Sequence, residues 1–369
     1  MENILNSTIA AIEPKCREFE KKATCRIEQL TMPHWALGSL LDLGCDLVAM
    51  TRSMHPKVAR KSIFIMAADH GIAAEGVSLY PKEVTVQMVR NFVQGGAAIN
   101  ALSRQVGSRT IVVDMGVDGD LTQFVKAGQV VGAKVRHGTR NFLVEPAMTR
   151  DEALEAITTG IHLAQSYGAD VDVFGTGDMG IANTTSSAAI AAVLLDCPVE
   201  TVVGRGTGID DQRLAHKTHV IESAIRLHHL DLYSSLSSNA PRSLNSKEGL
   251  DVLQKVGGFE IAAIAGLILG AASIKRPVVV DGYISTAGAL IAQTLCPTSM
   301  DYVIASHASQ EKGHQLMLAK LGKRPLLDLG MRLGEGTGAA LAMNLVEAAV
   351  RIITEVATFE SAKVSEKIA

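Results

Sequence analysis

The stretch Phe174–Thr185, FGTGDMGIANTT, decides how the rest of this chain is interpreted. It follows a short apolar run, Val171–Phe174, and places Gly175, Gly177 and Gly180 in the spacing G-x-G-x-x-G. Between a strand and a helix, that spacing is the fingerprint of a turn that binds dinucleotides. A glycine-rich turn that opens a helix also suits a single phosphate, because free N–H groups and the helix dipole favour an anion. The stretch predicts a strand, a turn and a helix, and leaves two classes of ligand open.

Other short apolar runs alternate with long Ala-rich helical patterns along the chain. Each run is nearly continuous in apolar character, as are strands that are buried on both faces of a parallel sheet. The predicted strands are Ser62–Ala67, Thr110–Asp114, Val171–Phe174, Thr201–Val203, Pro277–Asp281 and Tyr302–Ala305. The predicted helices cover residues 84–105, 149–167, 184–195, 212–228, 259–273, 288–295, 311–321 and 338–358. This alternation predicts an α/β fold, with a doubly wound, mainly parallel sheet flanked by helices.

The two ends of the chain differ from its centre. Residues 1–60 have amphipathic helical patterns that are interrupted at Pro14, Pro33 and Pro56. Together with the C-terminal helical segment, about 338–369, they are predicted to form a small helical domain beside a large α/β catalytic domain over 61–337. The Ser/Asn-rich segment 232–247 is predicted to be a surface excursion.

Composition narrows the class of protein. Apolar residues make up 47% of the 369 residues and aromatic residues only 4%, so small aliphatic side chains fill the core. The net charge of −3 gives no basic surface, which argues against a nucleic-acid partner. No run of 18 apolar residues and no export signal is found, so no membrane partner is predicted. The five scattered cysteines are typical of reduced, mostly buried thiols in a cytoplasmic protein.

Polar or glycine-rich turns follow five of the six predicted strands. In an open α/β sheet, the loops at the carboxyl ends of the strands form the ligand site. Asp69 and His70 in the first of these turns are therefore candidate site residues. The five turns are ADHG (68–71), GTGDMG (175–180), GRGTGIDD (204–211), DGYIST (281–286) and SHAS (306–309).

The dinucleotide hypothesis can be tested further along the chain. An NAD site needs an acidic residue about 20 positions on, at the end of the next strand. The next predicted strand ends in Gly204–Arg205–Gly206, and Asp196 precedes that strand. The incomplete fingerprint favours a single phosphate on the turn, to which Lys217 could add a point charge, and an NAD-dependent dehydrogenase becomes a distant alternative.

Glu335 lies between Gly334 and Gly336 in LDLGMRLGEGTGAALA, residues 327–342. A carboxylate flanked by glycines leaves room for a planar ligand beside it. An acidic residue at this point also suits the N-terminus of the helix that follows. The local sequence favours neither interpretation.

Together these motifs resemble one family, and the likeness runs from about residue 60 to 350. The chain is similar to the nicotinate-nucleotide:dimethylbenzimidazole phosphoribosyltransferases of cobamide biosynthesis, often called CobT. The resemblance implies a dimer with a parallel α/β sheet and a small helical domain, and neither a metal nor a bound cofactor. It implies transfer of 5-phosphoribose from nicotinate mononucleotide to an aromatic lower-ligand base. The motifs are the stretches 68–102, 174–185, 202–210, 257–272, 306–314 and 327–342.

The resemblance also implies roles for single residues. Glu335 looks like the general base, and Asp178 stands where the family usually has Glu, so both are predicted to be catalytic. The residues predicted to bind the phosphate and ribose are Gly177, Gly180, Asn183, Lys217 and Ser309. Those predicted to line the base pocket are Ser78, Gln87 and Leu333, with Asp69, His70 and Trp35 as further candidates.

One segment departs from the family. A T-K-P-P-G-S-L-G-like segment is usual, but Thr31–Gly38 reads TMPHWALG, with Met32, Trp35 and Ala36 in place of Lys, Gly and Ser. These changes fit drift in a packing segment, or a reshaped acceptor pocket if the small domain approaches a neighbouring subunit's site.

We expect 5,6-dimethylbenzimidazole as the acceptor. Phenol or p-cresol is the alternative, and so is a heterodimer with a paralogue in place of a homodimer. A non-catalytic nucleotide-binding subunit is a third hypothesis, which the retention of Glu335 disfavours.

Overall fold

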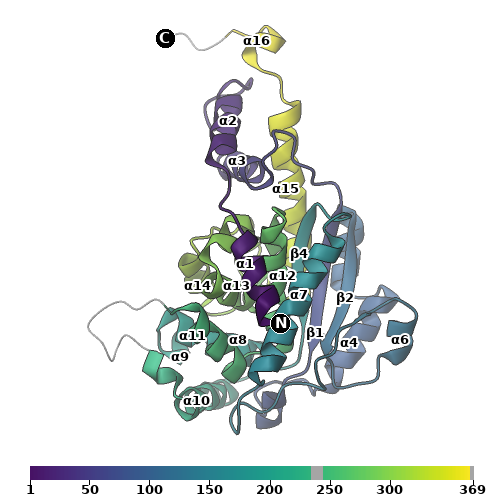
Figure 1. Cartoon of the computed structure of the whole chain (residues 1–369), viewed down its shortest axis with the longest axis vertical. Helices are drawn as coiled ribbons and strands as arrows, with labels where there is room; N and C mark the ends of the chain where they lie inside the picture. Colours follow the sequence, from purple (N-terminus) through teal and green to yellow (C-terminus); the bar gives the residue numbers. More distant parts are fainter. Residues whose placement is uncertain (234–243, 366–369) are drawn as a thin grey trace.

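A six-stranded parallel sheet forms the centre of the protein (Figure 1). The structure, a computed structural model, describes residues 1–233 and 244–365. The strand order is β3-β2-β1-β4-β5-β6, and all five neighbouring pairs are parallel, which confirms the predicted fold class. The strands are β1 (Lys61–Ala68), β2 (Ser108–Gly116), β3 (Val131–Gly132), β4 (Val173–Met179), β5 (Val278–Val280) and β6 (Val303–Ala305).

The strand order reverses between β1 and β4. The chain adds β2 and β3 on one side of β1 and then returns to add β4, β5 and β6 on the other. In open α/β sheets, ligands bind outside the carboxyl ends of the strands at such a switch point. The turns after β1 and β4 are therefore the expected centre of a site.

Helices cover the sheet and surround its carboxyl end. Helix α12 packs against β1, β2 and β4 and is covered in turn by α7, whereas α15 packs against β1, β4 and β5. The helices that precede β4 are α1 (Glu2–Ala11), α2 (Arg17–Glu28), α3 (Ser39–Thr51), α4 (Glu83–Gln94), α5 (Ala98–Val106), α6 (Thr122–Lys126) and α7 (Arg150–Tyr167). Those that follow β4 are α8 (Asn183–Leu195), α9 (Val199–Val202), α10 (Asp211–Leu227), α11 (Ser246–Val256), α12 (Phe259–Ser273), α13 (Tyr283–Leu295), α14 (His314–Leu321), α15 (Thr337–Glu355) and α16 (Phe359–Ala362).

Helices α2 and α3 project from the body beside the end of α15 (Figure 1). They enclose a second apolar cluster that includes Ala23, Leu41 and Ile353. A short antiparallel bridge between Leu30 and Thr358 ties the two ends of the chain together. Helix α1 instead packs on α7 and α12. The division into a small domain, residues 1–60 with 338–369, and a large domain, 61–337, stays a prediction.

Several predicted elements differ from the structure. Thr201–Val203 is not a strand, because Thr201 and Val202 lie in α9 and Val203 follows it as extended chain. The predicted helix over 84–105 is two helices, since Gly95 and Gly96 end the first. Helix α11 replaces the end of the predicted surface excursion, whose residues 234–243 lie outside the described part of the chain.

The cysteines are less buried than predicted. Cys45 and Cys296 are buried, Cys16 and Cys197 are half-buried, and Cys25 is exposed on the polar helix α2. All five are free thiols.

Helix α15 is long and apolar enough to cross a membrane when judged by length and composition alone. Its buried residues pack against three strands and against α3 and α5, and the core helix of a soluble protein passes the same test.

Candidate active site

The opening glycine motif and the Gly-Glu-Gly turn at the start of α15 pack directly against each other. Gly175 and Gly177 lie inside β4, so only Gly180 is in the turn that follows the strand. A Cβ atom at Gly177 would sit 2.6 Å from the carbonyl oxygen of Glu335, which only glycine avoids. The motif therefore serves close approach to the Glu335 turn. It is not the strand-end turn of a dinucleotide site, which removes the support for a dehydrogenase.

Glu335 is held in an unusual conformation with its carboxylate inside the protein. Its φ is +61°, and its neighbours Gly334 and Gly336 also have positive φ, so three successive residues are left-handed. The side chain is buried and its Oε2 has no hydrogen-bond partner among the described residues. Burial raises the pKa of Glu335, and a hydrogen bond from the backbone at Ile99 partly opposes that rise. Such a carboxylate is suited to accept a proton from a ligand.

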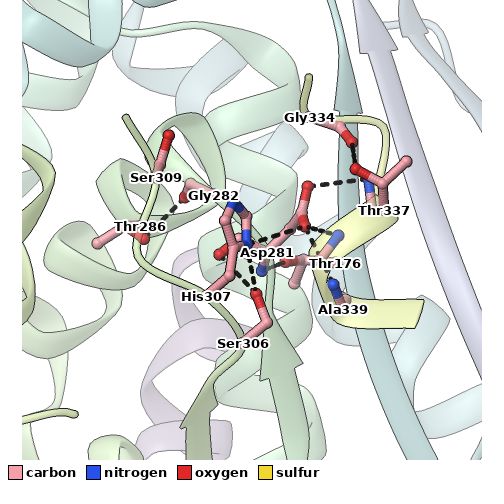
Figure 2. A network of polar contacts seen from close by, with 12 residues as sticks. Thr176, Asp281, Gly282, Thr286, Ser306, His307, Ser309, Gly334, Thr337 and Ala339 are labelled. Carbon is pink, nitrogen blue, oxygen red and sulfur yellow. Dashed lines mark hydrogen bonds and ion pairs between the residues drawn. The ribbon is translucent and has the colours of Figure 1, made fainter. Parts of the chain in front are cut away.

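Asp281, which follows β5, fixes the start of α15 (Figure 2). Its carboxylate accepts hydrogen bonds from the N–H groups of Gly336 (2.9 Å), Gly338 (2.7 Å) and Ala339 (3.1 Å). These are the first free N–H groups of the helix, so Asp281 caps it from a distant part of the chain. Burial raises the pKa of Asp281 to about 7, although the backbone hydrogen bonds oppose this. Asp281 therefore places Glu335 without touching it.

Asp178 lies near the end of β4, beside Gly334. Asn183, the first residue of α8, donates a hydrogen bond from Nδ2 to Asp178 Oδ2 at 3.0 Å. Asp178 Oδ1 is buried without a partner in the described chain. Burial, followed by the charges of Asp281 and Glu260, raises the pKa of Asp178 well above its usual value. Asp178 and Glu335 thus both present a free buried oxygen in the same region.

A buried Glu–His–Ser row supports the Gly180 turn. His70 Nε2 lies 2.6 Å from Oε1 of Glu260 in α12, and His70 Nδ1 lies 3.0 Å from Oγ of Ser186 in α8. A Cβ atom at Gly180 would overlap the carbonyl oxygen of Ala68 and touch the imidazole of His70. The imidazole therefore packs against the turn, and both of its ring nitrogens already have partners within the protein.

Asp69 turns toward the loop after β2. Its Oδ2 accepts a hydrogen bond from the N–H of Asp118 at 2.7 Å, and burial raises its pKa. This contact joins the ends of two neighbouring strands.

Lys217 brings a buried positive charge to the turn 204–208. Its side chain is 1% exposed, and Nζ donates to Oγ1 of Thr184 at 2.8 Å and to the carbonyl oxygen of Gly204 at 3.4 Å. Burial lowers the pKa of Lys217 to about 8, while the charge of Glu311 acts in the opposite direction. Nζ donates to two neutral acceptors, so an anion would stabilise it further. Ser309 stands two residues before Glu311 in the chain, and its Oγ accepts a hydrogen bond from the N–H of Glu311 at 3.2 Å.

The predicted base-pocket residues are at the protein surface. Leu333 is 57% exposed, and Gln87 on α4 is also exposed. Ser78 Oγ is 3.4 Å from Oγ1 of Thr207, which links the segment after η1 (Gly71–Glu75) to the turn that contacts Lys217.

Trp35 is far from Glu335 within one chain. It packs on the second apolar cluster and donates from Nε1 to Oδ1 of Asp42 at 2.8 Å. That cluster lies at the end of α15, and Glu335 precedes its start. A 19-residue helix is roughly 28 Å long, so the two residues are separated by about that distance.

Within residues 1–233 and 244–365, no group of three His, Cys, Asp or Glu side chains is arranged to hold a metal ion.

An open parallel α/β sheet with glycine-rich turns near its switch point is typical of proteins that bind phosphorylated ligands. The family model described as Phosphoribosyltransferase, DBI_PRT, matches residues 12–364, so the chain belongs to this phosphoribosyltransferase family.

Named relatives cover the whole chain. It is 53% identical over 364 residues to the nicotinate-nucleotide–dimethylbenzimidazole phosphoribosyltransferase of Syntrophotalea carbinolica, with 99% of each chain covered. It is 49% identical to the enzyme of the same name from Desulfotalea psychrophila. That match covers 98% of this chain and 99% of the relative. The crystal structure of CobT from Thermus thermophilus superposes with a TM-score of 0.85 at 42% identity, covering 95% of this chain and all of that one.

Proposed function

We propose that this protein transfers the 5-phosphoribosyl group of nicotinate mononucleotide to 5,6-dimethylbenzimidazole. The products are α-ribazole 5′-phosphate and nicotinate, which places the reaction in the assembly of the cobamide nucleotide loop. The names of the relatives support this substrate pair. The observation that carries the proposal is the free, buried oxygen of Glu335 beside β4, in a chain of this family.

The reaction needs one bond to break, one to form and one proton to move. The electron pair of the C1′–N bond passes to the pyridinium ring, so nicotinate leaves with a neutral nitrogen. A ring nitrogen of the benzimidazole bonds to C1′, and its other N–H gives its proton to Glu335. Asp178, whose Oδ1 is buried without a partner in the described chain, would contact the ribosyl group as the second acid of the site.

The remaining site residues have proposed roles that follow from their positions. Lys217 and Ser309, with Gly177, Gly180 and Asn183, would bind the ribose phosphate. Ser78, Gln87 and Leu333 would line the acceptor pocket from the surface. His70 and Asp69 would support the turns.

Trp35 could reach only the site of another subunit, which fits a dimer, either a homodimer or a heterodimer with a paralogue. We place the protein in the cytoplasm.

The direct test is incubation of the pure protein with nicotinate mononucleotide and a panel of bases. Dimethylbenzimidazole, benzimidazole, adenine, phenol and p-cresol are supplied singly, and products are identified by mass. Dimethylbenzimidazole is expected to give the ribosyl phosphate product and nicotinate. Product with the phenols alone would replace the proposed acceptor, and no product with any base would overturn the proposal.

As the pH is lowered, activity is expected to begin to fall at a pH above 4.5, the ordinary pKa of a Glu side chain. Glu335 must be ionised to accept a proton, and burial raises its pKa, so protonation begins to inhibit at higher pH than for an exposed Glu. The measurement is kcat/KM for dimethylbenzimidazole against pH. A profile that stays flat down to pH 4 would contradict this assignment.

Lys217→Met is expected to raise the KM for nicotinate mononucleotide about 10- to 100-fold, the value of a charge-assisted hydrogen bond. Methionine keeps the length of the side chain and removes its charge. Because the pKa of Lys217 is about 8, wild-type kcat/KM should also fall above that pH as the ammonium loses its proton. The exposed Lys126→Met is the matched control. An unchanged KM in Lys217→Met would show that the phosphate binds elsewhere.

A further inference from the structure

A row of hydrogen bonds runs from Ser309 to the end of β5. The N–H of Ser309 donates to Nδ1 of His314 at 2.9 Å, and His314 Nε2 is 2.9 Å from Oγ1 of Thr286. Thr286 in turn donates from Oγ1 to the carbonyl oxygen of Gly282 at 2.8 Å. His314, Thr286 and the chain at Gly282 are all buried, so water does not interrupt the row. Figure 2 shows the hydrogen bond from Thr286 to Gly282, with Ser309 on one side of it and Asp281 on the other.

The partners of His314 fix its tautomer. Nδ1 accepts a hydrogen bond from a backbone N–H, so it carries no proton. Burial, together with the nearby His307, lowers the pKa of His314 to about 3, so the ring stays neutral at physiological pH. The single ring proton is therefore on Nε2 and is donated to Thr286, whose own proton goes to Gly282. Each member of the row can donate in only one direction.

The hydrogen bonds that Ser309 makes within the protein determine what it can offer a ligand. Its N–H is used by His314, and its Oγ accepts a hydrogen bond from the N–H of Glu311. Within the described chain, the hydroxyl proton of Ser309 has no acceptor. The hydroxyl is consequently oriented as a donor, which is the form that a phosphate oxygen accepts.

We propose that His314 is a positioning residue that holds Ser309 by its N–H, so that the Ser309 hydroxyl donates to the 5-phosphate of the nucleotide. The inference rests on the proposed function, because that function supplies the phosphate. The other end of the row is Gly282, which adjoins Asp281, and Asp281 caps the helix α15 that begins just after Glu335. One junction after β5 thus sets both the phosphate contact and the base.

A purely structural His314 would behave differently. Its ring also packs at 6.5 Å from Tyr283 and at 6.2 Å from His307. If packing were its whole role, substitution would weaken the protein without distinguishing donors that have a phosphate from those that lack one.

The test compares His314→Gln with His314→Asn. Asn can place Oδ1 near the position of Nδ1 and accept from Ser309, whereas Gln reaches toward the position of Nε2 and leaves the Ser309 N–H without its acceptor. Dissociation constants are measured by calorimetry for nicotinate mononucleotide and for nicotinate riboside, which has no phosphate. His314→Gln should weaken mononucleotide binding about 10- to 100-fold and riboside binding less than about 3-fold. His314→Asn should stay within about 5-fold of wild type for both ligands.

Two further variants keep the test decisive if His314→Gln does not fold. Thr286→Val removes only the hydroxyl at the middle of the row and should weaken mononucleotide binding about 3- to 10-fold, again without affecting the riboside. Ser309→Ala should reproduce the loss seen for His314→Gln. Equal weakening of both ligands, or Thr286→Val binding that matches wild type, would overturn the inference. Failure of the wild-type protein to bind or turn over the mononucleotide would instead overturn the proposed function.

Discussion

Glu335→Gln is expected to lower the kcat of phosphoribosyl transfer about 10²- to 10⁴-fold, the usual contribution of a positioned general base. The amide has the shape of the carboxylate but cannot take the proton that the benzimidazole loses on attack. The free Oε2 and the raised pKa of Glu335 are what that task requires. The KM for nicotinate mononucleotide should change little, because the contacts that we propose for the donor are at Lys217 and Ser309 and not at Glu335. Product formation is followed by mass for each base of the panel.

Glu355→Gln is the matched control for this prediction. Glu355 ends the same helix, is exposed, and is 3.7 Å from Arg351, so losing its charge should leave the kcat within about 2-fold of wild type. If Glu335→Gln turned over every base at the wild-type rate, Glu335 would not be the base. Its role would then be the alternative that the sequence leaves open, a negative charge before the N-terminus of a helix.

Asp281→Ala is expected to lower the free energy of unfolding by roughly 3–5 kcal/mol. Alanine leaves the N–H groups of Gly336, Gly338 and Ala339 buried without an acceptor. Stability of a natural protein is only about 5–15 kcal/mol, so this loss is a large part of the total. The measurement is the free energy of unfolding from urea denaturation.

Asp281→Asn is the milder variant and isolates the effect on catalysis. Its oxygen can still accept from Gly338 and Ala339, but its amide group faces the N–H of Gly336, a donor against a donor. We expect a stability loss of about 1–3 kcal/mol and a fall in kcat with little change in the KM for the mononucleotide, because Glu335 moves. Asp120→Ala, which removes an exposed carboxylate from the N–H of Thr122, should cost less than about 1 kcal/mol. An Asp281→Ala protein as stable as wild type would show that water replaces the cap.

Elements with a strong local signal could be predicted from sequence. The apolar β1 run is buried over all eight of its residues, and the helix over 150–167 begins with the capping pair Thr149 and Glu152. Helix α11 has the same kind of signal in Asn245 and Glu248, within a segment whose Ser and Asn content favours a surface excursion. Pro198, directly before α9, similarly marks the start of a helix where the β-branched residues predict a strand. Strand β3 has only two residues, too few for a periodic pattern.

The site was partly predictable for a different reason. Glu335, Lys217 and Asp178 can be picked out as candidates because each stands in or shortly after a glycine-rich motif, and the structure buries all three side chains. Asp281 and His314 instead form hydrogen bonds with backbone N–H groups, those of Gly336 and Ser309 among them, which only the folded chain brings to them. Asp281 caps a helix that starts 55 or more residues later in the chain. No local pattern records such a partner, so these residues become visible only with coordinates.

The left-handed backbone at Glu335 means that the residue proposed for catalysis at this position is not the residue that would give the most stable protein. An L-residue other than Asn or Asp costs about 1 kcal/mol or more in that conformation, and glycine costs almost nothing. Selection for heat resistance alone would therefore be drawn to Glu335→Gly, which relieves this conformational cost and removes the proposed base. Any consensus or thermostability design on this scaffold should hold position 335 fixed.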